Sequence, residues 1–189
     1  MIQPPDVSGT NGALRVYTIG HSTRTGDDFI ALLRRYDIVT LADIRTVPRS
    51  RHNPQFNTEE LARTLPSEGI AYAHLAGLGG LRRGLGDASP NTGWRNAGFR
   101  AYADYMQTEP FRQSLDELLV LAARGPAAIM CAEAVPWRCH RSLVADALVI
   151  RGVVVLDIFD QRHAAPHHMT PFARVEGDRI TYPPEEPPA

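Results

Sequence analysis

Five short, mostly apolar runs, separated by segments with helical periodicity, constrain the fold of this chain more than any other feature. The runs cover residues 15–20, 38–45, 70–75, 126–131 and 153–159. Regular alternation of this kind predicts an α/β fold, in which helices cover both faces of a mostly parallel sheet. Residues 173–182 alternate in polarity around a glycine and are compatible with a C-terminal β-hairpin.

Apolar spacing and end signals predict the intervening helices. Thr25 begins a capping-box sequence ahead of one helix, and Pro110 is expected to separate two others. Further helices are expected over residues 59–65, 99–106 and 111–124, and around residues 143–148, where one inner face is apolar. Residues 77–98 form a long glycine-rich loop, which is uncommon unless the loop is functional. No linker divides the chain, so we expect a single domain over residues 1–189, with disordered tails at 1–13 and 183–189.

Charge and apolar content exclude several classes of protein. The formal net charge is −1, which argues against wholesale electrostatic attraction to nucleic acid or anionic membranes. All 20 basic residues are arginines, which suits bidentate recognition of phosphate or carboxylate but is more simply explained by genome composition. The N-terminus lacks a signal-peptide pattern, and the longest apolar stretch is too short to cross a bilayer. Two cysteines make no disulfide scaffold, so we expect a cytoplasmic protein with reduced thiols and no membrane partner.

Polar side chains follow three of the predicted strands. His21 and Ser22 come after the first strand, Asp43 and Arg45 end the second, and Cys131 ends the fourth. In a parallel α/β sheet, ligands bind at the carboxyl ends of the strands. We therefore expect these residues to share one edge and to form one site, whatever the lateral order of the strands.

The segment after the fourth strand holds the candidate catalytic residues. Cys131 is the candidate nucleophile, because the following helix N-terminus and nearby positive charge favour a thiolate; it could also be a small buried hydrophobe. His140 could activate Cys131 as a base or could merely cap the helix. Glu133 could be a general acid or base, or an ion-pair partner of an arginine. Cys139 has helical spacing to the apolar positions that follow, so we expect it to face the core; a resolving thiol is the alternative.

A further candidate acid or base is His21, although a histidine in such a turn can equally satisfy backbone groups of the loop. The candidate substrate-binding residues are mainly basic and would clamp an anionic group; they are Ser22, Asp43, Arg45, Arg49, Arg51, Arg138 and Arg141. Asp43 and Arg45 could instead form a structural salt bridge. The loop that carries Arg49 and Arg51 could be a solvated basic loop.

Metal binding is an alternative use of the same residues. Four of them are legitimate zinc or iron ligands, namely Cys131, Cys139, His140 and His21. The spacing of familiar zinc motifs is absent, so no metal ligand is assigned and the cofactor is left unknown. Three further histidines, His163, His167 and His168, are expected at the surface.

Several motifs along the chain resemble those of a known family. They are Thr18-Ile-Gly-His-Ser22, Asp43-Ile-Arg45, Pro48-Arg-Ser-Arg51, Pro54-Gln-Phe56, Leu78-Gly-Gly80, Phe99, Tyr102, Tyr105-Met106, Cys131-Ala-Glu133 and Cys139-His-Arg141. As a set, these motifs resemble the family catalogued as domain of unknown function 488. The resemblance implies a site near the motifs, and it carries no general activity to this chain.

A looser similarity concerns the rhodanese sulfurtransferases. Residues 41–45 look like their early aspartate-valine-arginine motif, and residues 129–152 look like their catalytic strand, loop and helix. Nine residues separate Cys131 from Arg141, which is more than in rhodaneses or the related phosphatases. Counting from Cys131 to Arg138 instead does not give the phosphatase spacing either. The loop of this chain therefore differs in length from the loops of both families.

These observations favour one hypothesis and leave two alternatives open. The favoured one is an enzyme, such as a Cys-dependent transferase or hydrolase, with a Cys/His/Arg site that acts on an anionic small molecule or nucleotide-like substrate. The first alternative is a phosphate- or nucleic-acid-binding module without catalysis. The second is a metal-binding protein that uses cysteine and histidine.

Overall fold

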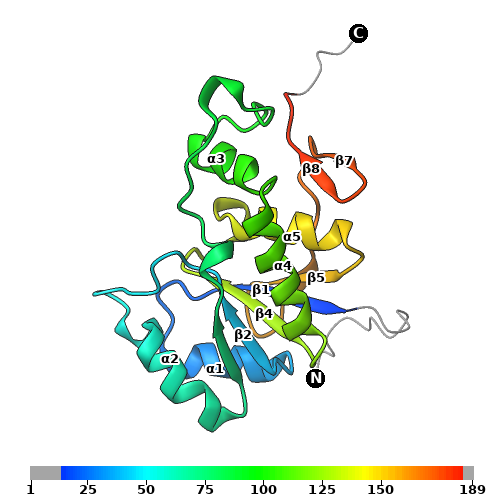
Figure 1. Cartoon of the computed structure of the whole chain (residues 1–189). Coiled ribbons are helices and arrows are strands. Elements are labelled where there is room, and N and C mark those ends of the chain that lie inside the picture. Colours follow the sequence, from blue (N-terminus) through cyan, green and yellow to red (C-terminus); the bar gives the residue numbers. More distant parts are fainter. Residues whose placement is uncertain (1–13, 185–189) are drawn as a thin grey trace.

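A computed structural model describes residues 14–184, and a six-stranded sheet lies at its centre (Figure 1). The strands are Arg15–Gly20 (β1), Thr40–Asp43 (β2), Ala71–His74 (β3), Ala127–Cys131 (β4), Val154–Ile158 (β5), Ala164–Pro166 (β6), Arg174–Glu176 (β7) and Arg179–Thr181 (β8). The order in the main sheet is β3-β2-β4-β1-β5-β6. The first five strands are parallel, and β6 pairs antiparallel with β5 at one edge. The mostly parallel sheet is therefore confirmed.

Five α-helices connect the strands of the described part of the chain: Gly26–Arg35 (α1), Thr58–Thr64 (α2), Ala97–Tyr105 (α3), Glu109–Ala122 (α4) and Arg141–Ile150 (α5). Short 3-10 turns cover Pro54–Phe56, Leu65–Glu68, Ala76–Leu78, Gly86–Ala88 and Pro136–Arg138. The predicted cap of α1 is present, since the amide N–H of Asp28 donates to the Thr25 hydroxyl at 3.1 Å.

Helices cover both faces of the sheet, as predicted, and they form two separate apolar cores (Figure 1). Alternate residues of each strand point to opposite faces, so Tyr17 and Ile19 of β1 contribute to one core and Val16 to the other. The first core contains α1 and α2, represented by Phe29 and Leu61. The second contains buried residues of α3, α4 and α5: Tyr102, Ala103, Phe111, Leu115, Leu118, Ala122, Leu143, Val144, Ala145, Ala147 and Leu148.

Helix α5 is buried on all sides, whereas the sequence indicated a single inner face. Every residue from Arg141 to Leu148 is buried. The sheet covers one side of the helix, and Ile180 and Tyr182 from the C-terminal segment belong to the same core. The predicted hairpin over residues 173–182 is present as β7-β8, with Gly177 at a positive φ of 63° in its turn.

Two local predictions were wrong, and one strand was not predicted. The second strand ends at Asp43, two residues earlier than expected. Pro110 lies in the first turn of α4 and not in a break between helices, because the first turn needs no N–H donor from that residue. The edge strand β6 was not predicted, since three residues that include a proline give too weak a strand signal.

The His167 side chain is only 5% exposed, which contradicts its predicted place at the surface. Its Nε2 lies 2.9 Å from Asp146 Oδ1, and its Nδ1 lies 3.0 Å from Asp157 Oδ2. Both carboxylates are buried, and the Tyr182 hydroxyl donates to Asp146 at 2.9 Å. Burial lowers the pKa of His167, but the hydrogen bonds to the two carboxylates outweigh burial and raise that pKa to about 9. We call Asp146, Asp157 and His167 the aspartate cluster.

The predicted tail at residues 1–13 lies outside the described residues, and so do residues 185–189 of the tail predicted at 183–189. Within the described part, no helix has the length and apolar content that a bilayer span needs.

Candidate functional site

The three polar strand ends predicted to share one edge are direct neighbours, because β4 lies between β2 and β1. Backbone hydrogen bonds continue the pairing past the strands. The amide of His21 donates to the carbonyl of Cys131 at 3.0 Å, and the amide of Ile44 donates to that of Met130 at 3.0 Å. The segments after β1, β2 and β4 therefore begin side by side, with Cys131 in the centre.

A cavity of about 380 Å³ opens at this edge. Its walls come from four separate parts of the chain: Arg45, Thr46 and Val47 after β2, Gly80 and Leu81, then Asn96, Gly98 and Phe99, and finally Cys131, Ala132, Glu133, Arg138, Cys139 and His140. The mouth is partly apolar, since Val47 and Leu81 are exposed. A pocket of this size with a few convergent polar groups is the usual form of a small-molecule site.

Two thiols and one imidazole meet in the wall of the cavity. His140 Nδ1 lies 3.9 Å from Cys131 Sγ and 3.6 Å from Cys139 Sγ, and all three atoms lie within 4.8 Å of one another. We call these residues the cysteine cluster. Cys139 is buried, as expected for a core residue, but it also lines the cavity beside Cys131. Its predicted burial is therefore confirmed, and its contact with the cavity leaves the alternative of a resolving thiol open.

The position of His140 defines which of its nitrogens carries a proton when the ring is neutral. His140 Nε2 lies 3.1 Å from the carbonyl oxygen of Ile44, and a carbonyl oxygen only accepts hydrogen bonds. Nε2 is therefore the donor, and Nδ1 presents a lone pair to the two thiols. Gly80 packs against the ring so closely that a Cβ there would lie 2.5 Å from Nδ1. His140 is the N-cap residue of α5, but its side chain makes no capping hydrogen bond and faces the two thiols instead.

The surroundings shift the pKa values of the two thiols in opposite directions. A hydrogen bond from Cys139 lowers the pKa of Cys131; burial opposes this effect, while His140 and the backbone amide of Glu133 lower the pKa further. The same hydrogen bond raises the pKa of Cys139, and burial raises it again. Cys131 is thus the thiolate of the pair, and Cys139 keeps the proton.

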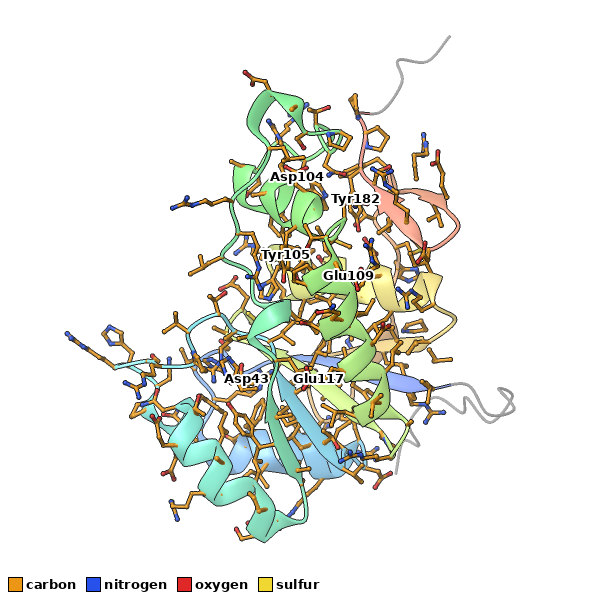
Figure 2. All side chains as sticks on the ribbon, in the orientation of Figure 1. Asp43, Asp104, Tyr105, Glu109, Glu117 and Tyr182 are labelled. Carbon is orange, nitrogen blue, oxygen red and sulfur yellow. The ribbon has the colours of Figure 1, made fainter. Side chains whose placement is uncertain are left out.

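Asp43 and Arg45 form a buried, bidentate ion pair at the end of β2 (Figure 2 labels Asp43). Arg45 Nε donates to Asp43 Oδ1 at 2.8 Å, and its Nη2 donates to the carbonyl of Phe56 at 2.6 Å. Tyr72 also donates to the Asp43 carboxylate, at 3.0 Å. Arg45 touches the cavity, but its donors are used within the protein. This pair is the structural salt bridge that was one of the two alternatives.

His21 supports Arg45 and does not reach the cavity. Its Nδ1 lies 2.8 Å from the carbonyl of Ser22, and its Nε2 lies 3.3 Å from Arg45 Nη1. The first contact requires a proton on Nδ1 and the second requires a lone pair on Nε2, so both nitrogens are in use. Burial lowers the pKa of His21, which agrees with a neutral ring. The structure favours backbone and arginine support over the predicted acid or base role.

Arg141 shapes the loop after β4 from inside the protein. It is fully buried, and it donates to the carbonyls of Glu133 at 2.6 Å and Ala134 at 2.9 Å. Gly20 allows the loop to pass, since a Cβ there would lie 1.8 Å from the carbonyl oxygen of Glu133. Arg141 is therefore not available for the predicted anion clamp, because its donors hold backbone carbonyls.

Of the remaining predicted residues, two line the cavity and three do not. Arg138 and Glu133 are exposed residues of its wall. Ser22 lies in a turn with a positive φ of 49°, and Arg49 and Arg51 are exposed outside the cavity. The Arg49 side chain pairs with Glu59, so the picture of a solvated basic loop agrees with this segment.

Sequence reasoning missed part of the cavity wall. The missed residues are Val47, Leu81, Gly98 and Phe99, which are apolar or small, and Asn96, which is polar. Three lie at the two ends of the glycine-rich segment 77–98, whose length alone indicated function. Asp104 of α3 orders the middle of that segment (Figure 2), because it accepts hydrogen bonds from Leu85, Ser89 and Asn91.

The cysteine cluster also has the donor set of a metal site. Two thiolates and one imidazole nitrogen match the ligands of zinc, and the Nε2–H of His140 on a backbone carbonyl is the usual support for a ligating histidine. His21, the fourth candidate ligand, lies outside this cluster.

The fold and the site define a three-layer α/β protein with paired cysteines at the carboxyl ends of parallel strands. Residues 25–148 match the family described as "Domain of unknown function DUF488". The match covers more than half of the chain, so the protein belongs to this family, and the predicted family is confirmed. Comparison with curated proteins and with solved structures found no match. The looser similarity to rhodaneses is therefore unsupported.

Proposed function

We propose that this protein is an enzyme in which the Cys131 thiolate attacks an anionic small molecule or nucleotide-like substrate. The observation that carries the proposal is the contact between Cys131 and His140 Nδ1 in the wall of an open cavity. A thiol beside a base that a third group orients is the arrangement of Cys-dependent transferases and hydrolases. Here the carbonyl of Ile44 provides that orientation.

The anionic part of the substrate is proposed to lie at Arg138. Among the arginines expected to bind the substrate, Arg45 and Arg141 use their donors within the protein. Arg138 lines the cavity, and the structure shows no hydrogen bond from its guanidinium within residues 14–184. Glu133 lies on the same wall and can serve as a general acid for the leaving group.

Selective alkylation tests the nucleophile. Reduced protein is treated with iodoacetamide near neutral pH, and the labelled peptides are quantified by mass spectrometry. We expect Cys131 to react faster than Cys139, because the thiolate is the reacting species. Cys131→Ser should remove the fast label, whereas Cys139→Ser should retain it. Equally slow labelling of both thiols would contradict the proposal.

A comparison of charged and neutral reagents tests the anion site. Iodoacetate carries a carboxylate and iodoacetamide does not, so their rate ratio reports attraction of an anion to Cys131. We expect Arg138→Ala to lower this ratio severalfold. Arg63→Ala is the matched control, because Arg63 is an exposed arginine that pairs with Glu60 on α2. If both variants keep the ratio of the parent protein, Arg138 does not bind the anion.

A metal-binding function is a second candidate, and the geometry of the cysteine cluster favours it. A divalent ion bound by Cys131, Cys139 and His140 would leave one position toward the cavity, as in catalytic zinc sites. Elemental analysis of protein purified without an affinity tag is the direct test. Stoichiometric zinc would support this candidate, and folded, reactive protein without metal would remove it.

A further inference from the structure

We propose that Cys139 is a second reacting thiol, and that Cys131 and Cys139 together reduce a hydroperoxide and become an intramolecular disulfide. This inference goes beyond the proposed function and rests on its reactive Cys131. It adds a named role for Cys139 and a class of oxidising substrate.

Geometry is the first support. The two Sγ atoms lie within 4.8 Å of each other, and the chain contains two cysteines in all. A disulfide bond is about 2 Å long, so closure needs an approach of about 3 Å or less. No other pairing of cysteines within one chain competes with this one.

The shared base is the second support. His140 Nδ1 lies 3.6 Å from Cys139 Sγ, closer than the 3.9 Å that separates it from Cys131 Sγ. In this position, Nδ1 can accept the proton of Cys139 when that thiol attacks.

Access and loop structure are the third support. The cavity reaches both thiols, so a small oxidant and a small reductant can enter. The segment between the cysteines has one short turn at Pro136–Arg138 as its regular structure, and Ala132, Glu133, Ala134, Trp137 and Arg138 are exposed. Arg141 holds the first half of the segment through the carbonyls of Glu133 and Ala134, so the second half, where Trp137 and Arg138 are exposed beside Cys139, has to accommodate the approach of the two sulfurs.

The reaction has two balanced steps. The Cys131 thiolate attacks the terminal oxygen of the hydroperoxide. An S–O bond forms, the O–O bond breaks, and the leaving alkoxide takes a proton from the solvent to give an alcohol. Cys139 then gives its proton to His140 and attacks the Cys131 sulfur. The S–S bond forms, the S–O bond breaks, and hydroxide leaves with that proton as water. The dithiol loses two electrons to the peroxide, and an external thiol restores it by exchange.

Oxidation of the whole chain by hydrogen peroxide tests the proposal. Protein pretreated with a chelator and a reductant is oxidised with a slight excess of peroxide, then blocked with iodoacetamide. We expect a mass lower by two hydrogens, no alkylation, and a peptide pair joined through Cys131 and Cys139. Cys139→Ser should instead accumulate oxidised Cys131, which a sulfenic-acid reagent such as dimedone would trap. His140→Ala should slow disulfide formation by about tenfold or more.

Several outcomes would overturn the inference. One is wild-type protein that carries oxygen on Cys131 while Cys139 still alkylates, and another is no oxidation by peroxide at all. A disulfide that forms only in denaturant would do the same. Failure of the proposed function has a different signature, because it appears as slow alkylation of Cys131 before any oxidant is added.

Discussion

The cysteine cluster and the aspartate cluster are both built around a buried or half-buried histidine, yet they differ in what the imidazole contacts. In the aspartate cluster, both ring nitrogens of His167 meet carboxylates, at 2.9 and 3.0 Å. In the cysteine cluster, one nitrogen of His140 meets a carbonyl at 3.1 Å and the other faces two thiols in a cavity. Both ring nitrogens of His167 are therefore occupied by hydrogen bonds, whereas Nδ1 of His140 keeps a lone pair beside two thiols.

The two clusters are also linked through Arg141. Its Nε donates to the hydroxyl of Thr18 at 3.3 Å, and that hydroxyl donates to Asp157 at 2.6 Å. The other donors of Arg141 hold the loop beside Cys131. One buried polar network therefore stabilises the scaffold on which the reactive cluster lies.

His167→Ala should destabilise the protein most. It leaves the buried Asp146 and Asp157 without their shared partner, and removing one partner of a buried ionic group costs about 3–5 kcal/mol. Denaturant unfolding measures the change. His168→Ala is the matched control, because His168 is exposed and such substitutions usually stay within about 0.5 kcal/mol. Equal losses in both variants would show that the aspartate cluster is not the stabilising region.

The pH dependence of the unfolding free energy should also show that the aspartate cluster stabilises the fold. The native pKa of His167, about 9, lies above its usual value of 6.5. The charged ring thus contributes fully below pH 6.5, and its contribution is lost as pH rises toward about 9. We expect the unfolding free energy to fall across this window. His167→Gln cannot titrate there, so it should flatten the slope; a slope that survives must come from another group.

His140→Ala should have the opposite profile, with a modest effect on stability and a clear effect on chemistry. Loss of the base should slow alkylation of Cys131 by about tenfold or more near neutral pH. Competition labelling against a free thiol measures this rate in each variant. His167→Ala, assayed under conditions where it is folded, should keep most of the Cys131 reactivity. If His167→Ala slowed alkylation of Cys131 more than His140→Ala did, the aspartate cluster and not the cysteine cluster would control the reactivity of Cys131.

Arg49→Ala should have the smallest effect, because Arg49 lies outside both clusters. Its ion pair with Glu59 is exposed, with side-chain exposures of 72% and 65%, and such pairs contribute about 0–1 kcal/mol. We expect a change within about 0.5 kcal/mol in unfolding and unchanged alkylation of Cys131. A large loss of oligonucleotide affinity in this variant would instead revive the nucleic-acid-binding alternative.

Local pattern was enough to predict the framework and the central residue of the site. Alternating strands and helices indicated the parallel sheet, and the polar residues after three strands indicated their common edge. Cys131 follows from this edge, because a strand end and a helix start are both visible in the sequence. The strand order that makes these three ends direct neighbours came only from the structure.

The hydrogen-bond partners of the polar side chains could not be predicted from local pattern. Whether Arg141 and His21 meet a ligand or a backbone carbonyl depends on segments distant in the chain, and spacing along one segment carries no information about them. The burial of His167 depends on Asp146 and Asp157, which come from two other elements. Cys139 was placed in the core by its spacing alone, and its cavity-facing position depends on the 3-10 turn before α5.

By itself, the sequence determined the family, the α/β class and the reactive edge of the sheet, because periodicity and strand ends are local properties. Tertiary structure decided which polar groups are already satisfied and which remain available. Hydrogen bonds are short and directional, so a donor is either used or free according to contacts that only the folded chain brings together. That difference separates Cys131, Cys139 and His140 from the other candidates.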